Sequence, residues 1–88
     1  TFFCYWIDTV HKQAATTALF RAPVEQETAI GALFAKAMQT QSKAKGRLYD
    51  CGYRRDPVQA EQDRQSIRGA YATKSFEVLD VDWHPSDD

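Results

Sequence analysis

The sequence predicts an α+β fold in which a small, mainly antiparallel sheet carries two helices packed on one of its faces. Three observations lead to this class. Aromatic and β-branched residues dominate the first nine positions and the segment 75–83, as they do in strands. An apolar stripe at helical spacing occupies the middle of the chain, and an Asp-Pro pair at 56–57 marks the start of a second helix. The expected order of elements is β-β-α-(β)-α-β.

The chain is expected to form one compact domain over residues 1–84, with residues 85–88 as a frayed acidic tail. Its 88 residues are too few for a Rossmann or barrel enzyme fold. Leu, Ile, Val and Phe account for only 17 residues, but a net charge of −1 argues against disorder. We therefore expect a small core to which Trp, Phe and Tyr contribute much of the apolar surface.

Residues 2–9 predict the first strand, because they consist mainly of Phe, Tyr, Trp, Ile and Thr, which suit a pleated surface. Both of its alternating faces are apolar as far as Ile7. Such a strand is either central and covered on both sides, or its second face meets a partner. Residues 10–15 are polar and contain no Gly, which disfavours a tight two-residue turn. Residues 16–22 then predict a second strand, antiparallel to the first, which Pro23 ends.

Residues 24–44 predict the first helix, whose apolar stripe repeats at spacings of three and four. The stripe consists of Ile30, Leu33, Phe34, Ala37 and Met38. Glu25 and Glu27 suit the positive end of the helix dipole, and Gly46 suits a left-handed stop.

Residues 47–53 fit a short strand, although Asp and Gly within this segment disfavour one. The second helix is expected to begin at Pro57 with Asp56 as its cap, and to end at residue 68 or 71. Its apolar stripe is thin, which indicates a helix on the surface.

Cys4 and Cys51 are expected to be two small buried hydrophobic residues, since disulfides are rare in a reducing cytosol. The sequence leaves open whether they are near each other. The apolar start of the chain lacks the basic region of a signal peptide, and no run of eighteen apolar residues predicts a membrane span. We therefore expect a cytoplasmic protein.

The charges are segregated along the chain. Residues 36–55 hold six basic residues and one acid, whereas residues 75–88 hold five acids and no Lys or Arg. Patches of opposite sign steer partners of opposite charge. Each half of this asymmetry suggests a different binding partner.

The acidic half falls on the last strand, residues 75–83, where the apolar phase slips between Val78 and Leu79 and so predicts a bulge or bend. The residues expected to contact a basic protein surface are Glu77, Asp80, Asp82 and Trp83. The competing interpretation is that these charges protect a sheet edge from unwanted pairing. A further alternative is a metal site or small enzyme at Asp80, Asp82 and His84, three potential ligands on one face.

The basic half suggests a second alternative, a nucleic-acid or anion site in which arginines bind phosphate and tyrosines stack on bases. Its residues are Lys43, Lys45, Arg47, Tyr49, Tyr53, Arg54 and Arg55. The sequence pI near 6.0 argues against a dedicated nucleic-acid binder.

No motif for a catalytic serine, a zinc protease or a phosphate loop is present, so we expect no enzyme activity and no cofactor. The function expected is that of a small protein-binding module of inhibitor, immunity or anti-defence type, which acts stoichiometrically. Compact inhibitors carried by phages and other mobile elements share this size and lack of motifs, an analogy that rests on no shared residues. A homodimer through the first strand is a further expectation left open.

Overall fold

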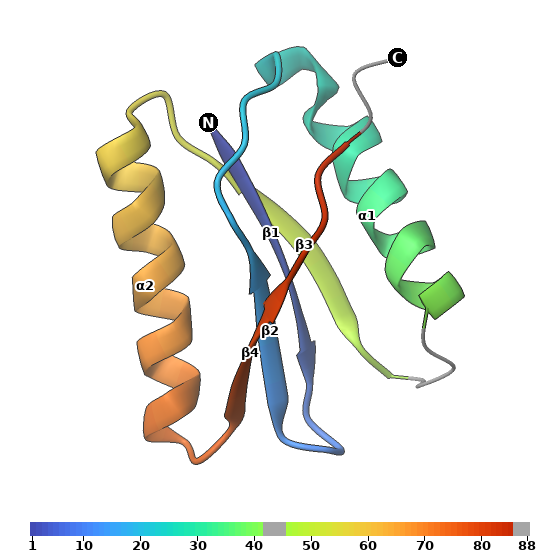
Figure 1. The fold of residues 1–88 in the computed structure, drawn as a ribbon, viewed down its shortest axis with the longest axis vertical. Coiled ribbons are helices and arrows are strands. Elements are labelled where there is room, and N and C mark those ends of the chain that lie inside the picture. Colours follow the sequence, from blue (N-terminus) through green and yellow to red (C-terminus); the bar gives the residue numbers. More distant parts are fainter. Residues whose placement is uncertain (42–45, 86–88) are drawn as a thin grey trace.

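A computed structural model describes residues 1–41 and 46–85 and shows a four-stranded sheet between two helices (Figure 1). The strands are β1 (Phe2–Asp8), β2 (Gln13–Thr17), β3 (Leu48–Tyr53) and β4 (Glu77–Val81). The helices are α1 (Glu27–Gln41), which follows a short 3-10 helix at Val24–Gln26, and α2 (Pro57–Thr73). The predicted α+β class and element order are confirmed. Neither helix has the length and apolar character needed to cross a membrane.

The strands lie in the order β3-β1-β2-β4. β1 runs antiparallel to both of its neighbours, and β4 runs parallel to β2. The sheet is therefore mainly antiparallel, as predicted. β3 and β4 are its two outer strands.

The two helices lie against opposite faces of the sheet (Figure 1), whereas the sequence-based expectation placed both on one face. Trp6 and its partner Ala15 belong to the core cluster that α1 covers. The adjacent pair Tyr5 and Thr16 points the other way, and the Thr16 hydroxyl accepts a hydrogen bond from Arg68 of α2. The strand order explains this arrangement. The two crossovers run in opposite directions across the sheet, so right-handed connections put their helices on opposite faces.

This arrangement explains why both faces of β1 are apolar. β1 is one of the two inner strands and has a helix on each side, and Phe2 and Phe3 are both fully buried although they point to opposite faces. It is thus central and covered, the first of the two alternatives expected for it. The edges and faces of β1 are thus occupied by elements of the same chain, and the homodimer expected through this strand stays a prediction.

The main core lies between α1 and the sheet and is rich in aromatic residues. Phe34 of α1 packs edge-on against Tyr49 and Trp83, with ring centroids 6.2 and 5.1 Å apart. The buried members of the cluster are Phe2, Cys4, Trp6, Ala15, Ile30, Phe34, Met38 and Cys51. Large rings thus supply the apolar area that so short a chain lacks in aliphatic residues.

The hairpin between β1 and β2 differs from the expectation. Asp8 pairs with Gln13, so four residues form the turn, and Lys12 adopts a left-handed conformation with φ 53°. β2 begins at Gln13 and ends at Thr17, earlier than predicted, and Phe20 forms only an isolated bridge to Phe2. Pairing with β1 and β4 outweighs the modest strand propensity of the Gln-Ala-Ala segment.

β4 contains no bulge, contrary to the prediction. Its five residues pair with β2 in one unbroken register. The apparent change of phase arises because each face of β4 carries both an apolar and an acidic residue. Val78 and Asp80 face the α2 side, and Glu77 and Leu79 face the α1 side.

The helix ends follow local rules. The Asp56 carboxylate caps α2 by accepting the Val58 N–H at 2.9 Å, with Pro57 in the first turn. α2 continues to Thr73, beyond the predicted end. α1 begins three residues later than predicted, and the last residues predicted for it, 42–44, lie outside the described residues. Gly46 is left-handed as expected, with φ 82°.

Cys4 and Cys51 form a disulfide, contrary to the expectation of two unpaired cysteines. Cys4 and Cys51 are direct partners in the β1–β3 register. Thr1 and Arg54 form a hydrogen-bonded pair, in which each backbone N–H donates to the carbonyl of the other residue. Hydrogen-bonded and non-hydrogen-bonded pairs alternate along antiparallel strands, so Cys4 and Cys51, three positions further along, form a non-hydrogen-bonded pair. In such pairs the side chains approach most closely, and spacing along the sequence gives no indication of this.

We predict that replacing both cysteines, Cys4→Ala with Cys51→Ala, lowers the free energy of unfolding markedly. The disulfide closes a loop across 47 positions of sequence. Loss of such a cross-link costs about 2–4 kcal/mol, chiefly through the greater freedom of the unfolded chain. Urea denaturation of the variant and of the wild type, with and without reductant, measures the effect. Free thiols in the denatured wild-type protein, or identical unfolding curves, would contradict the prediction.

Candidate functional site

The three acids of the last strand do not share one face. Glu77 lies on the α1 side of β4, where its carboxylate accepts a hydrogen bond from the Gln13 side chain at 3.0 Å. Asp80 lies on the α2 side, and alternation places Asp82 there too. All three residues are exposed. β4 thus presents carboxylates on both sides of an outer strand.

Trp83 belongs to the core rather than to the acidic surface. Its ring packs edge-on against Phe20 and Phe34, with centroids 6.1 and 5.1 Å away. The side chain is half-buried, so it supports the end of β4 from the α1 side.

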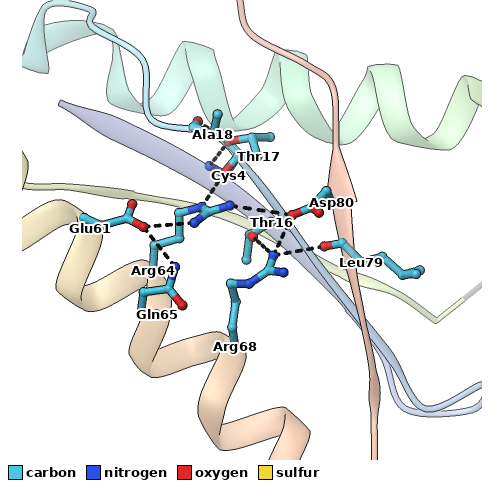
Figure 2. Close-up of polar contacts among 10 residues, drawn as sticks. All are labelled: Cys4, Thr16, Thr17, Ala18, Glu61, Arg64, Gln65, Arg68, Leu79 and Asp80. Atoms are coloured by element: carbon cyan, nitrogen blue, oxygen red, sulfur yellow. Dashed lines mark hydrogen bonds and ion pairs between the residues drawn. The ribbon is translucent and has the colours of Figure 1, made fainter.

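Two arginines of α2 reach across to the sheet and meet at Asp80 (Figure 2). The Arg68 Nη1 donates to the Thr16 hydroxyl at 2.7 Å, to the Leu79 carbonyl at 3.3 Å and to Asp80 at 2.9 Å. The Arg64 Nε donates to the Thr17 carbonyl at 2.7 Å, and its Nη2 lies 3.7 Å from Asp80. These contacts fasten α2 to β2 and β4.

This cluster changes the electrostatics of β4. The Arg64 and Arg68 side chains are 14% and 21% exposed, whereas that of Asp80 is 79% exposed. The two guanidinium groups therefore offset the Asp80 charge from the protein side and leave its outer oxygen facing solvent. Among the described ion pairs, none involves Glu77 or Asp82.

Sequence reasoning missed the two arginines, although a signal was present. They are four residues apart and flank Ile67, so they share the sheet-facing side of α2 with the few apolar residues there. The thin apolar stripe of this helix is completed by arginine side chains that lie largely buried against the sheet.

We predict that Arg68→Ala lowers the free energy of unfolding by about 2 kcal/mol, because it leaves polar groups on β2 and β4 without their donor. Asp80→Ala costs less than about 1 kcal/mol, since an exposed carboxylate is readily solvated. Urea denaturation of the two variants measures both effects. Equal losses in the two variants would show that Arg68 acts only through its ion pair.

A second polar cluster lies at the turn between β1 and β2. The Asp8 side chain is fully buried and accepts the His11 backbone N–H at 2.9 Å. It also contacts the His11 Nδ1 at 2.8 Å and the Arg47 Nε at 3.2 Å. The Arg47 guanidinium in turn stacks on the Trp6 ring, 3.9 Å from its centroid.

These contacts lower the pKa of Asp8 from 3.8 to about 2. The largest cause is the hydrogen bond from the His11 backbone N–H; the His11 imidazole and Arg47 add to it, and burial opposes it. The cluster closes the hairpin turn and ties it to the start of β3. It therefore serves the fold, and no local sequence pattern indicates that residues 8 and 47 meet.

We predict a specific acid sensitivity from this carboxylate. Its pKa is lower in the folded state, so the stability that it adds at neutral pH is lost as the pH falls from about 4 toward 2. Asp8→Asn lowers the melting temperature at pH 7 by roughly 10 °C, because Arg47 loses its buried partner. Thermal unfolding of both proteins between pH 7 and pH 2 measures this. The gap between their melting temperatures should narrow in acid, and a constant gap would contradict the assignment.

The residues of the basic segment do not converge on one surface within the described ranges. Arg47 is only 11% exposed and bound to Asp8, whereas Arg54 pairs with Asp63 at 2.6 Å at the other end of β3. At about 3.3 Å per residue, the two arginines are roughly 23 Å apart along the strand. Arg55 is exposed beside Arg54. Lys43 and Lys45 lie outside the described residues.

The two tyrosines of this segment face α1. The Tyr49 ring packs edge-on against Phe34, and the Tyr53 ring lies 4.9 Å from that of Phe2. Neither ring is a free stacking platform for a base. The geometry therefore gives the nucleic-acid alternative little support.

The metal alternative finds little support as well. Across residues 1–41 and 46–85, no three His, Cys, Asp or Glu residues gather closely enough to hold a metal ion. Asp80 is bound by arginines, and the His84 ring lies beside the Pro85 carbonyl at 3.0 Å. Both cysteines are in the disulfide, so neither is a free thiol nucleophile.

Comparison with known proteins adds no relative: the chain matches no family model, no curated protein and no solved structure.

Proposed function

We propose that the protein is a small stoichiometric binding module, of inhibitor or immunity type, that docks on a basic surface of another protein through β4. One observation carries this proposal. β4 is an outer strand, and the carboxylates of Glu77, Asp80 and, directly after its end, Asp82 are exposed to solvent. Acids gathered along an outer strand suit a partner of positive charge.

The use of polar side chains elsewhere supports binding rather than catalysis. In the described part of the chain, Asp8 and Arg47 are used to close the hairpin, and Arg64 and Arg68 are used to fasten α2. His11 is held by Asp8, and both cysteines are oxidised. These polar groups thus have structural partners, and the exposed acids at β4 are left to act on something outside the fold.

The disulfide bears on where such a module works. Disulfides persist in oxidising compartments and are rare in the reducing cytoplasm. The Cys4–Cys51 bond therefore favours an oxidising compartment over the cytoplasm expected from the sequence.

The test is to reverse one charge on β4 and one elsewhere. Asp82→Lys changes the acidic strand; Glu27→Lys makes the same change in net charge at an exposed acid beside β3. A partner captured from lysate with the wild-type protein, identified by mass spectrometry and purified, is titrated with each variant. We expect saturation at equal molar amounts. Asp82→Lys should weaken affinity about tenfold or more, because it sets like charges against each other.

Glu27→Lys should leave the affinity within about twofold, since screening limits the reach of a distant surface charge. Equal losses of affinity in the two variants would show that the partner responds to the net charge of the protein and not to the acids at β4. Turnover of the partner by trace amounts of the protein would replace a stoichiometric role with a catalytic one.

A further inference from the structure

We infer that the partner binds β4 by adding a strand to the sheet, through an extended segment in which basic and apolar residues alternate. This inference rests on the proposed function and gives the partner segment its conformation and its chemistry. It depends on three features: the backbone edge of β4, the two faces beside that edge, and the charge that excludes a second copy of the chain.

The outer backbone edge of β4 is open. The Glu77 N–H donates to the Lys12 carbonyl at 2.8 Å, on the side of β2. Since backbone groups alternate in direction along a strand, the N–H groups of Val78 and Asp80 point away from β2. Within the described ranges no strand pairs with this edge. An added strand would satisfy these groups.

The outer edge of β3 is less open by comparison. Cys51 and Cys4 form a non-hydrogen-bonded pair, so the Cys51 N–H points away from β1. The Asp50 carboxylate folds back and accepts that N–H at 2.8 Å. A strand added to β3 would have to displace this contact in the middle of the edge, which favours β4 as the edge for pairing.

The two sides of the β4 edge differ in chemistry. On the α2 side, Asp80 and Asp82 suit basic side chains. On the α1 side, one recess is lined by Trp6 and Val81 together with charged residues such as Arg47, and a second by Leu33 and Trp83 together with Lys36. Gln41 borders both recesses, so they follow one another between α1 and the end of β4. A strand laid here would turn its basic residues to one side and its apolar residues to the other.

Charge excludes a second copy of this chain as the occupant. Two β4 edges paired with each other would bring Asp80 and Asp82 of one copy against the same acids of the other. Like charges opposite each other in a sheet are destabilising. The same carboxylates that repel a second copy attract a basic strand.

The experiment uses a capped heptapeptide of alternating Lys and Val, titrated into the whole protein and followed by NMR. We expect binding, with amide hydrogen exchange at Val78 and Asp80 slowed about tenfold or more at saturation. A peptide of the same composition, with its Lys and Val in separate blocks, should bind more weakly without this protection. Two N-methylated forms of the alternating peptide serve as controls, each methylated at one of the two alternating sets of N–H groups. The form that lacks the N–H groups facing β4 should not protect Val78 and Asp80.

Each outcome decides one point. Binding that Asp82→Lys abolishes, but that leaves exchange at Val78 and Asp80 unchanged, overturns strand addition and leaves the acidic docking surface intact. If Asp82→Lys binds the alternating peptide with unchanged affinity and the amides of Val78 and Asp80 are still protected, strand addition is supported and the charge-based proposal is contradicted. Failure of the alternating peptide to bind overturns the inference. Protection of the two amides in the free protein, with a dimer in sedimentation, would assign the edge to a second copy.

Discussion

The fold depends on the position of β1, which has a strand on each edge and a helix on each face. A strand covered on both faces favours apolar residues on both, and β1 supplies them from Phe2 to Ile7, while its buried Asp8 is paired with Arg47. Its central place leaves β3 and β4 as the outer strands. It also requires two covering helices, although the chain is short and the apolar stripe of α2 is thin. Arginine side chains supplement that thin stripe and hold α2 on the sheet.

Polar side chains hold together elements that share little apolar contact area. Arg64 and Arg68 bind α2 to the sheet through carbonyl, hydroxyl and carboxylate oxygens (Figure 2). Asp8 and Arg47 do the same for the hairpin and β3 on the other half of the molecule. In both clusters the arginine stem lies against the protein and the charged head is paired. These four charged residues therefore stabilise the fold itself, whereas Glu77 and Asp82 form none of the described ion pairs.

The sequence predicts what is local and does not predict what depends on strand order. Periodicity at Ile30, Phe34 and Met38 predicts α1, and the Asp-Pro pair predicts the start of α2, because both signals lie within a few turns of helix. The opposite placement of the helices, the disulfide and the contact of Asp8 with Arg47 all require knowing which strands are neighbours. For the acidic strand, the sequence predicts exposure correctly. It cannot predict the arginines that meet Asp80 from α2.

The Cys4–Cys51 bond divides the chain into a closed ring and an open arm. The ring contains most of β1, the whole of β2 and α1, and part of β3. A single backbone cut anywhere inside it leaves both fragments covalently joined. The arm carries α2 and β4, and side-chain and backbone contacts alone hold its far end against the ring. Of the two outer strands, β4 thus lies wholly outside the ring that the disulfide closes, whereas part of β3 lies within it.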